Sequence, residues 1–153
     1  MSTAAGSAMA ADRAYPARPI LAVSTAVVRN GNVLVAQRAR APGAGLYSLP
    51  GGLVEVGETL AEAAARELME EVGVLASPIG LCGARDIIAR DGDGRIERHF
   101  VVLTYAAHWE SGEGLRSDEA TDVRWVTLAG ARALPTTDGL LATLEAAIAL
   151  AAR

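Results

Sequence analysis

The chain has 153 residues, of which 51% are hydrophobic and 21% are charged, and its formal net charge is −4. This length favours a single globular domain, and the composition is not that of a disordered chain. The acidic balance argues against a nucleic-acid polymer as partner, because such a partner requires a basic surface. No apolar run reaches the roughly 18 to 20 residues of a membrane span, so we expect no membrane partner.

The N-terminal residues predict a tail that precedes the folded domain. Residues 1–18 are small and polar, are interrupted by proline, and lack the apolar core of a signal peptide. The single cysteine, Cys82, excludes an internal disulfide and fits a reducing compartment. We therefore predict a flexible tail over residues 1–18, one domain over residues 19–153, and a cytoplasmic location.

Apolar and β-branched residues predict a series of strands. Asn30-Gly31 separates the first two and is typical of a tight hairpin turn. The sequence DGDG at 91–94 predicts the turn of a second, longer hairpin, and the polar segment 111–121 predicts a loop before a last short strand. The predicted strands are 20–29, 33–38, 79–90, 96–109 and 122–126.

Two segments have the apolar spacing of helices. The first should run from Leu60 to Val72, with Thr59 as N-cap and Gly73 as the residue that ends it. The second lies within residues 136–153, with a Thr or Asp as N-cap. Strands interleaved with these helices predict an α/β fold, layered α/β/α around a mixed sheet.

The first helix carries glutamates at a spacing that makes them repel one another. Glu67, Glu70 and Glu71 stand at positions i, i+3 and i+4. Arg66 is adjacent, but it lies about 100° around the helix from Glu67, so we expect that it cannot neutralise three carboxylates. A hard divalent cation such as Mg²⁺ could do so. A solvated acidic helix face is the alternative, and the helix by itself does not exclude it.

The loop before this helix contains Gly51 and Gly52. Without side chains, these residues let a backbone carbonyl and a phosphate group approach the same ion. The glycine pair therefore favours the metal interpretation of the glutamates.

Taken together, these residues match a known pattern over 23 residues of the chain. The pattern resembles the Nudix box of the Nudix hydrolases at every defined position, which are Gly52, Glu58, Arg66, Glu67, Leu68, Glu70, Glu71, Gly73 and Val74. The resemblance implies an α/β/α sandwich and hydrolysis, dependent on Mg²⁺ or Mn²⁺, of a nucleoside diphosphate linked to another group X. The partner would then be a small molecule, and a homodimer stays open.

The same resemblance implies roles for individual residues of the box. Glu67 and Glu71 would be the principal metal ligands, Glu70 a third ligand or the residue that orients water, and the Gly51 carbonyl would complete the metal shell. Arg66 would serve catalysis indirectly, by holding the loop and the helix together with Glu58.

The general base stays open at this point. Members of the family take it from the helix, here Glu70, or from a distant loop, here Glu119 with Asp118 beside it. A solvated loop acid is the alternative for Glu119. A metal-bound hydroxide without a separate base is a further alternative.

Residues for substrate binding are expected near the box. Gly52 lets a phosphate approach, Arg38 could bind a phosphate bidentately, and Tyr47 could stack on a base, as could Trp109 or Trp125. The alternatives are an ordinary charge at a strand end for Arg38 and core positions for most of the aromatics.

The identity of X stays open as well. The chain is similar to bacterial members described as ADP-ribose pyrophosphatase-like or MutT-like, but Ala89 stands in the region where dedicated ADP-ribose hydrolases carry a proline. ADP-ribose, nucleotide sugars and nucleoside triphosphates all remain candidates. A non-catalytic nucleotide-binding regulator is the alternative function, and the complete set of box carboxylates favours the enzyme.

Overall fold

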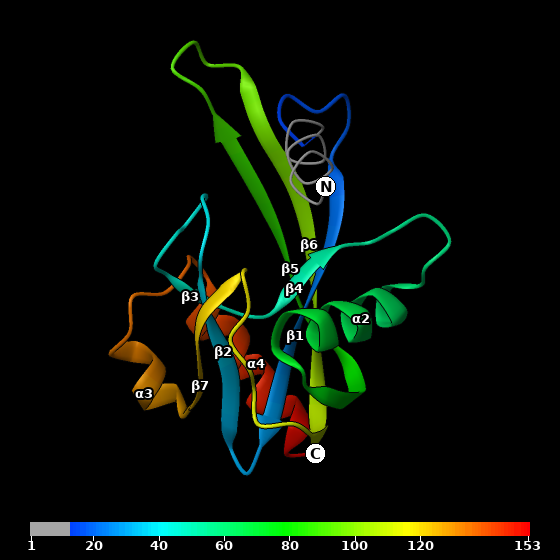
Figure 1. Cartoon of the computed structure of the whole chain (residues 1–153), viewed down its shortest axis with the longest axis vertical. Coiled ribbons are helices and arrows are strands. Elements are labelled where there is room, and N and C mark those ends of the chain that lie inside the picture. The colour runs from blue at the N-terminus through cyan, green and yellow to red at the C-terminus, as the bar shows by residue number, and fades with distance from the viewer. Residues whose placement is uncertain (1–12) are drawn as a thin grey trace.

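The computed structural model describes residues 13–153, and it contains one mixed sheet with helices packed against it (Figure 1). The predicted tail falls largely on residues 1–12, which lie outside the described part. The elements are β1 (Ile20–Arg29), β2 (Asn32–Arg38), β3 (Tyr47–Ser48), β4 (Gly51–Leu53), α2 (Leu60–Val72), β5 (Leu75–Arg90), β6 (Ile96–Ser111), β7 (Ala120–Val126), α3 (Leu128–Arg132) and α4 (Leu140–Ala151).

The strand order is β3-β2-β1-β6-β5, with β4 paired to β1 and β7 paired to β2. The β1–β6 pair is parallel, whereas β1–β2, β1–β4, β2–β3, β2–β7 and β5–β6 are antiparallel. The predicted mixed sheet is therefore confirmed.

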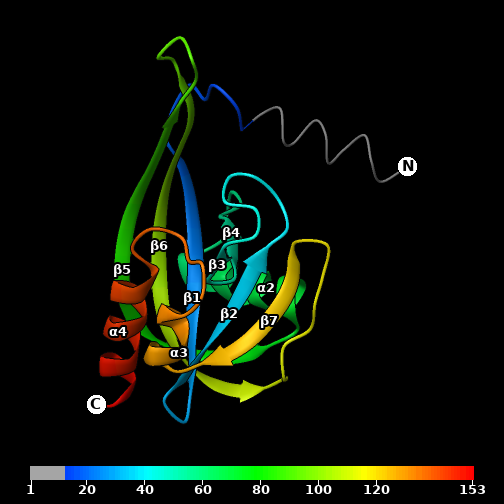
Figure 2. The same ribbon diagram turned by 90° about the vertical axis from the view of Figure 1, so that its left-hand side faces the viewer.

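The side chains of β1 alternate between the two faces of the sheet and so belong to two different core layers. Val23 and Val27 face the side on which α2 packs, while Ala26 and Val28 face the side that contains Leu144 of α4. Figure 2 shows α3 and α4 on one side of the sheet and α2 on the other. The predicted α/β/α layering is confirmed, because the central strand is buried on both faces.

Helix α2 begins and ends where the sequence predicts. The Oγ1 atom of Thr59 accepts a hydrogen bond of 3.1 Å from the amide of Glu62. Gly73 adopts φ 66° and donates its amide to the carbonyl of Met69. Both caps are local interactions, which is why the sequence predicts the bounds of this helix correctly.

The prediction for the last helix needs one correction. Helix α4 begins after Gly139, which has φ 79° and no side chain, so neither Thr nor Asp is its N-cap. The short helix α3 and the short strands β3 and β4 were not predicted, because none is long enough to show a period.

The β5–β6 hairpin extends beyond the body of the fold, and the N-terminal segment lies against it (Figure 1). The amide of Tyr15 donates to the carbonyl of Glu97 at 2.8 Å, and the Tyr15 hydroxyl donates to Asp91 at 2.7 Å. The Arg95 guanidinium lies 4.6 Å from the centre of the Tyr15 ring. Residue 15 is therefore held by the domain, although it falls within the predicted tail.

Among residues 13–153, no helix is long and apolar enough to cross a membrane.

A substitution at Leu144 tests the packing of α4 on the sheet, because this side chain is fully buried between them. Leu144→Ala should lower the free energy of unfolding by about 2 to 5 kcal/mol, since the change leaves a cavity. Leu81→Ala is the control, because Leu81 is 51% exposed on β5, and it should change stability by less than about 1 kcal/mol. Equal effects in a denaturant titration would contradict the assigned packing.

Candidate active site

Arg66 connects the loop that follows β4 to helix α2. Its Nε and NH2 atoms donate to the two carboxylate oxygens of Glu58, both at 2.8 Å, and NH2 also donates to the carbonyl of Leu53 at 3.0 Å. These hydrogen bonds lower the pKa of Glu58 to about 2. A bidentate pair of this kind holds both partners in one orientation, so the loop and the helix are fixed relative to each other.

Arg66 also reaches two of the helix glutamates. Its NH1 atom lies 2.9 Å from Glu67 and 3.2 Å from Glu70. The expectation that Arg66 points away from Glu67 was wrong, because the long side chain curves back across the helix surface. Part of the repulsion among the glutamates is thus relieved by Arg66.

Three carboxylates from two distant segments meet beside this network. Glu67 and Glu71 of α2 and Glu119 of the β6–β7 loop each offer an oxygen atom, and these atoms lie within 4.8 Å of one another. Among residues 13–153, Glu71 and Glu119 form no ion pair. A cluster of hard oxygen donors in which only Glu67 has a cationic partner, Arg66, fits a divalent cation such as Mg²⁺ or Mn²⁺.

Burial makes negative charge costly in this cluster. It raises the pKa of Glu71 to about 7, and the nearby charges of Glu119 and Glu67 add to the shift, whereas a 3.0 Å hydrogen bond from the Gly51 amide opposes it. Burial also raises the pKa of Glu67, against the hydrogen bond from Arg66. Both carboxylates therefore favour a cation or a proton at this position.

Glu70 lies outside the cluster. Its side chain is 61% exposed and pairs with Arg66. It lines a small surface hollow together with Asp118 and the three clustered carboxylates. The structure thus gives Glu119, and not Glu70, the third position beside Glu67 and Glu71.

Gly51 and Gly52 lie where side chains would not fit. A Cβ at Gly52 would overlap the Glu67 carboxylate, and a Cβ at Gly51 would overlap the backbone of Val23 and Ser24 in β1. The glycines therefore let β4 lie between β1 and α2, and they place the Gly51 amide on Glu71. A metal contact through the Gly51 carbonyl remains a prediction.

Two tryptophans hold the start of the loop that carries Glu119. The Arg29 guanidinium lies 4.3 Å from the centre of a Trp109 ring and 5.1 Å from that of Trp125, and it pairs with Glu113 at 2.9 Å. The indole N–H groups donate to the carbonyls of Gly112 and Glu113 at 2.7 and 2.9 Å. Trp109 and Trp125 thus anchor a loop and are not placed to stack on a base.

The rest of the loop is tied to neighbouring elements. The amide of Leu115 donates to the carbonyl of Val72 at the end of α2, at 2.8 Å. The amide of Ala39, just after β2, donates to the carbonyl of Glu119 at 3.1 Å. Glu119 is therefore positioned from both sides, by the helix end and by the sheet.

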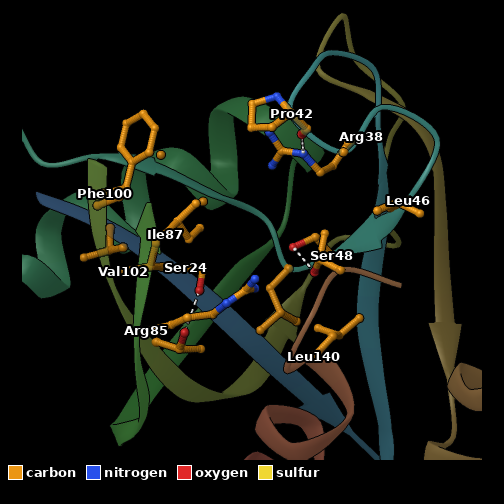
Figure 3. Close-up of a pocket in the computed structure, with 18 of the residues that line it drawn as sticks. Ser24, Arg38, Pro42, Leu46, Ser48, Arg85, Ile87, Phe100, Val102 and Leu140 are labelled. Carbon is orange, nitrogen blue, oxygen red and sulfur yellow. Dashed lines mark hydrogen bonds between the residues drawn. The ribbon is translucent and has the colours of Figure 1, made fainter. Parts of the chain in front are cut away.

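A cavity of about 610 Å³ opens beside the carboxylates. Figure 3 shows Ile87, Phe100 and Val102 of the β5–β6 hairpin on one side of it, and Arg38 and Leu46 on the other. Its lining also includes Gly52, whose role in substrate binding remains a prediction. The Arg38 guanidinium lines the cavity and donates from Nε to the carbonyl of Pro42 at 2.8 Å.

Tyr47 requires a correction. Its ring is 4% exposed within the α4 core layer, its hydroxyl donates to Asp122 at 2.5 Å, and it does not line the cavity. The predicted contact with substrate is contradicted, because a short strand turns this side chain inward and leaves its neighbours Leu46 and Ser48 to face the cavity.

Several cavity residues were missed by the sequence analysis. The hydroxyls of Ser24 and Thr104 share a buried hydrogen bond of 2.8 Å, and Arg85, Arg98 and Asp138 also line the space. The alternation along 98–104 could have indicated one common face, but only the pairing of β6 with β1 shows which face meets the carboxylates.

Comparison with known proteins bears on this arrangement. The family model for the NUDIX domain matches residues 18–144, which include the whole carboxylate cluster and the loop that carries Glu119. The chain belongs to the Nudix hydrolase family.

Named relatives and solved structures agree with this family. An ADP-ribose pyrophosphatase of Methanocaldococcus jannaschii is 31% identical over 110 residues, which are 72% of this chain and 63% of that protein. A Mycobacterium tuberculosis protein provisionally named 8-oxo-dGTP diphosphatase 2 is 40% identical over 112 residues, or 71% of this chain and 74% of its own length. The crystal structure of a MutT NUDIX hydrolase from Burkholderia pseudomallei superposes with a TM-score of 0.69 at 32% identity, covering 84% of this chain and 97% of that one. The chain spans less than two thirds of the archaeal relative.

Glu71→Gln tests how far the buried negative charge of Glu71 destabilises the folded protein. The folded-state pKa of Glu71 is raised from 4.5 to about 7. The protonated Glu71 side chain therefore stabilises the fold relative to the ionised one: this stabilisation is fully present below about pH 4.5 and is lost as the pH rises through about 7. At pH 8 without metal, the free energy of unfolding of the variant should exceed that of the wild type by roughly 1 to 3 kcal/mol. The reason is that the amide of Gln carries no charge but its oxygen can still accept the hydrogen bond from Gly51. At pH 4.5 the difference should vanish.

Thermal unfolding at the two pH values, with and without Mg²⁺, measures this. Added Mg²⁺ should stabilise the wild type more than the variant. Glu62→Gln, on the exposed side of the same helix, is the control and should show neither effect. A variant as sensitive to pH as the wild type would contradict the assignment.

Proposed function

We propose that this protein is a Mg²⁺- or Mn²⁺-dependent pyrophosphohydrolase that cleaves the pyrophosphate linkage of a nucleoside diphosphate joined to another group X. The observation that carries the proposal is the meeting of Glu67, Glu71 and Glu119 at the edge of a cavity that also contains arginines. Carboxylates suit the cation, and arginines suit the phosphates.

Glu67 and Glu71 would hold the ion, and Glu119 lies close enough to share it or to contact a water beside it. When bound, the ion supplies charge neutralisation and Lewis acidity toward the phosphoryl group. Arg66 and Glu58 keep the two helix ligands and the glycine loop in one arrangement, so Arg66 supports catalysis without touching the reacting atoms.

Glu119 is the general base in this proposal. It is the most exposed of the three clustered carboxylates, so it can meet a water that enters with the substrate. It would accept a proton from that water as the oxygen attacks phosphorus in line with the leaving group. Asp118 and Glu70 do not line the large cavity, whereas Glu119 does.

The substrate class follows from the cavity and from the relatives. The cavity of about 610 Å³ has the size of a small-molecule site, with apolar residues that can contact a base. The relatives are named for ADP-ribose and for 8-oxo-dGTP, which are both nucleotides with a pyrophosphate linkage. A nucleoside 5′-diphosphate derivative is the shared class.

Metal removal and a substrate panel test the function directly. Formation of nucleotide products from ADP-ribose, nucleotide sugars, dinucleotides and (deoxy)nucleoside triphosphates, followed by chromatography, should require Mg²⁺ or Mn²⁺ and stop in excess EDTA. The fold should survive chelation, because its core is apolar. Full turnover in EDTA, or no turnover of any member with either metal, would overturn the proposal.

Glu119→Gln tests the assigned base. The change should lower kcat by roughly 10² to 10⁴, because an amide cannot accept the proton. Asp118→Asn is the matched control one residue away and should retain most activity. Measuring kcat together with Mn²⁺ affinity separates proton transfer from metal binding: a large loss in Asp118→Asn with an active Glu119→Gln would show that the neighbouring residue is the base.

A further inference from the structure

Two hydroxyl groups form a polar spot on the sheet face that lines the cavity. Ser24 of β1 and Thr104 of β6 pair in register, and their hydroxyl oxygens lie 2.8 Å apart. A dashed line in Figure 3 marks this hydrogen bond at Ser24. Both residues line the cavity, yet their exposed fractions are only 9% and 7%. The Ser24–Thr104 pair therefore lies at the floor of the cavity.

The rest of this sheet face is apolar around the pair. Residues two positions apart share a face of a strand. The neighbours on this face are Ala22 and Ala26 on β1, and Val102 and Ala106 on β6. Ala26 and Ala106 belong to the core layer beneath α4, whereas Ala22 and Val102 line the open cavity. The hydroxyls thus interrupt an apolar surface at the border between core and cavity, where packing by itself requires no polar group.

The two hydroxyls have one hydrogen atom more than their mutual bond uses. Each hydroxyl can donate one hydrogen bond and accept others, and a bond between two of them uses a single hydrogen. Within residues 13–153, neither Ser24 nor Thr104 makes another side-chain hydrogen bond. A buried donor without an acceptor costs free energy, and a ligand oxygen in the cavity would remove that cost.

The pair lies next to the carboxylate cluster. Ser24 is in register with Gly51, and a Cβ at Gly51 would lie 2.9 Å from the Cβ of Ser24. The amide of Gly51 is itself 3.0 Å from a carboxylate oxygen of Glu71. Because neighbouring strands are about 4.8 Å apart, Ser24 and Thr104 stand roughly 5 and 10 Å across the sheet from Gly51.

Neighbouring strands leave the two oxygens uncovered. At the level of the pair, β4 contributes Gly51 and β5 contributes Gly83, which pairs with Thr104. Neither residue has a side chain that would lie over the hydroxyls. A Cβ at Gly83 would lie 3.7 Å from Thr143 of α4, so the helix limits the space on that side. A ligand group can therefore approach the pair from the cavity.

The sugar of a nucleotide suits this position. With the phosphates at the carboxylate cluster, the ribose hydroxyls are the first hydroxyl groups that follow along the nucleoside. A hydroxyl accepts and donates hydrogen bonds, so it can take the spare hydrogen of the pair and donate to a lone pair of Ser24 or Thr104. The base follows the sugar and lies farther from the cluster.

We propose that the Ser24–Thr104 pair binds the 2′- or 3′-hydroxyl of the ribose next to the cleaved linkage, and that it thereby selects substrates with an intact ribose over deoxyribonucleotides. This inference rests on the proposed function, because the carboxylate cluster sets where the phosphates lie. It narrows the substrate class to derivatives of ribonucleoside diphosphates.

Binding of nucleoside monophosphates tests the selection without turnover, because these ligands contain no pyrophosphate linkage. AMP and GMP are compared with their 2′-deoxy and 3′-deoxy forms by calorimetry in Mg²⁺. Loss of one of the two hydroxyls should weaken binding to the wild type roughly three- to tenfold, as expected for one hydrogen bond. Where a nucleoside triphosphate is turned over, the same ratio should appear in kcat/KM.

Variants identify the residues responsible. The double variant Ser24→Ala with Thr104→Val removes both hydroxyls, and its ratio of ribonucleotide to deoxynucleotide affinity should fall to near one. Thr104→Ser keeps a hydroxyl and should keep the preference. Thr25→Val is the matched control: Thr25 is 4% exposed, does not line the cavity, and its hydroxyl has no hydrogen-bond partner among the described residues. It should keep the wild-type ratio.

The outcomes separate this inference from the proposed function. Equal affinity for intact and deoxy sugars, or a ratio that the double variant leaves unchanged, would overturn the inference while the hydrolase stands. A change in the preference between AMP and GMP instead would assign the pair to the base and also overturn it. A sugar preference that the double variant removes, without turnover of any pyrophosphate substrate, would support the inference and overturn the hydrolase. Melting curves of each variant check that the fold is intact.

Discussion

The packing of β4 between β1 and α2 is the constraint on which the site depends. Only glycine fits at Gly51, since a side chain there would overlap the backbone of β1, and a side chain at Gly52 would displace the Glu67 carboxylate. The close approach buries Glu71 against the Gly51 amide and raises its pKa to about 7. The fold therefore holds negative charge where solvent stabilises it poorly, and this is the condition under which a divalent cation binds strongly.

The third carboxylate of the cluster arrives by a separate route. Glu119 belongs to a loop that Arg29, Trp109 and Trp125 clamp at its start and that backbone hydrogen bonds tie to α2 and to the end of β2. The helix and the loop are thus held in place by contacts that do not involve the clustered carboxylates. Such support lets the protein keep repelling charges together without metal, because rigid neighbours balance the repulsion.

Local features of the sequence were sufficient for much of the fold. Thr59 and Gly73 bound α2 because capping involves residues only three or four apart, and Asn30-Gly31 gives a hairpin turn because both residues tolerate positive φ. Long-range features were not accessible in this way. The reach of Arg66 to Glu67, the inward position of Tyr47 and the glycine cap of α4 depend on neighbours that the sequence does not specify locally.

The sequence by itself determined the family, the mixed α/β architecture, and two of the three clustered carboxylates, because the spacing of the Nudix box is local and helical geometry converts it into one surface. Only the tertiary structure decided that Glu119 joins Glu67 and Glu71 while Glu70 pairs with Arg66. It alone attached the N-terminal segment to the β5–β6 hairpin, through the hydrogen bonds of Tyr15 to Glu97 and Asp91. The physical reason is that Glu119 is 48 and 52 positions from Glu71 and Glu67, and Tyr15 is 76 and 82 positions from Asp91 and Glu97, so these contacts depend on strand pairing and loop anchoring and not on any periodic pattern.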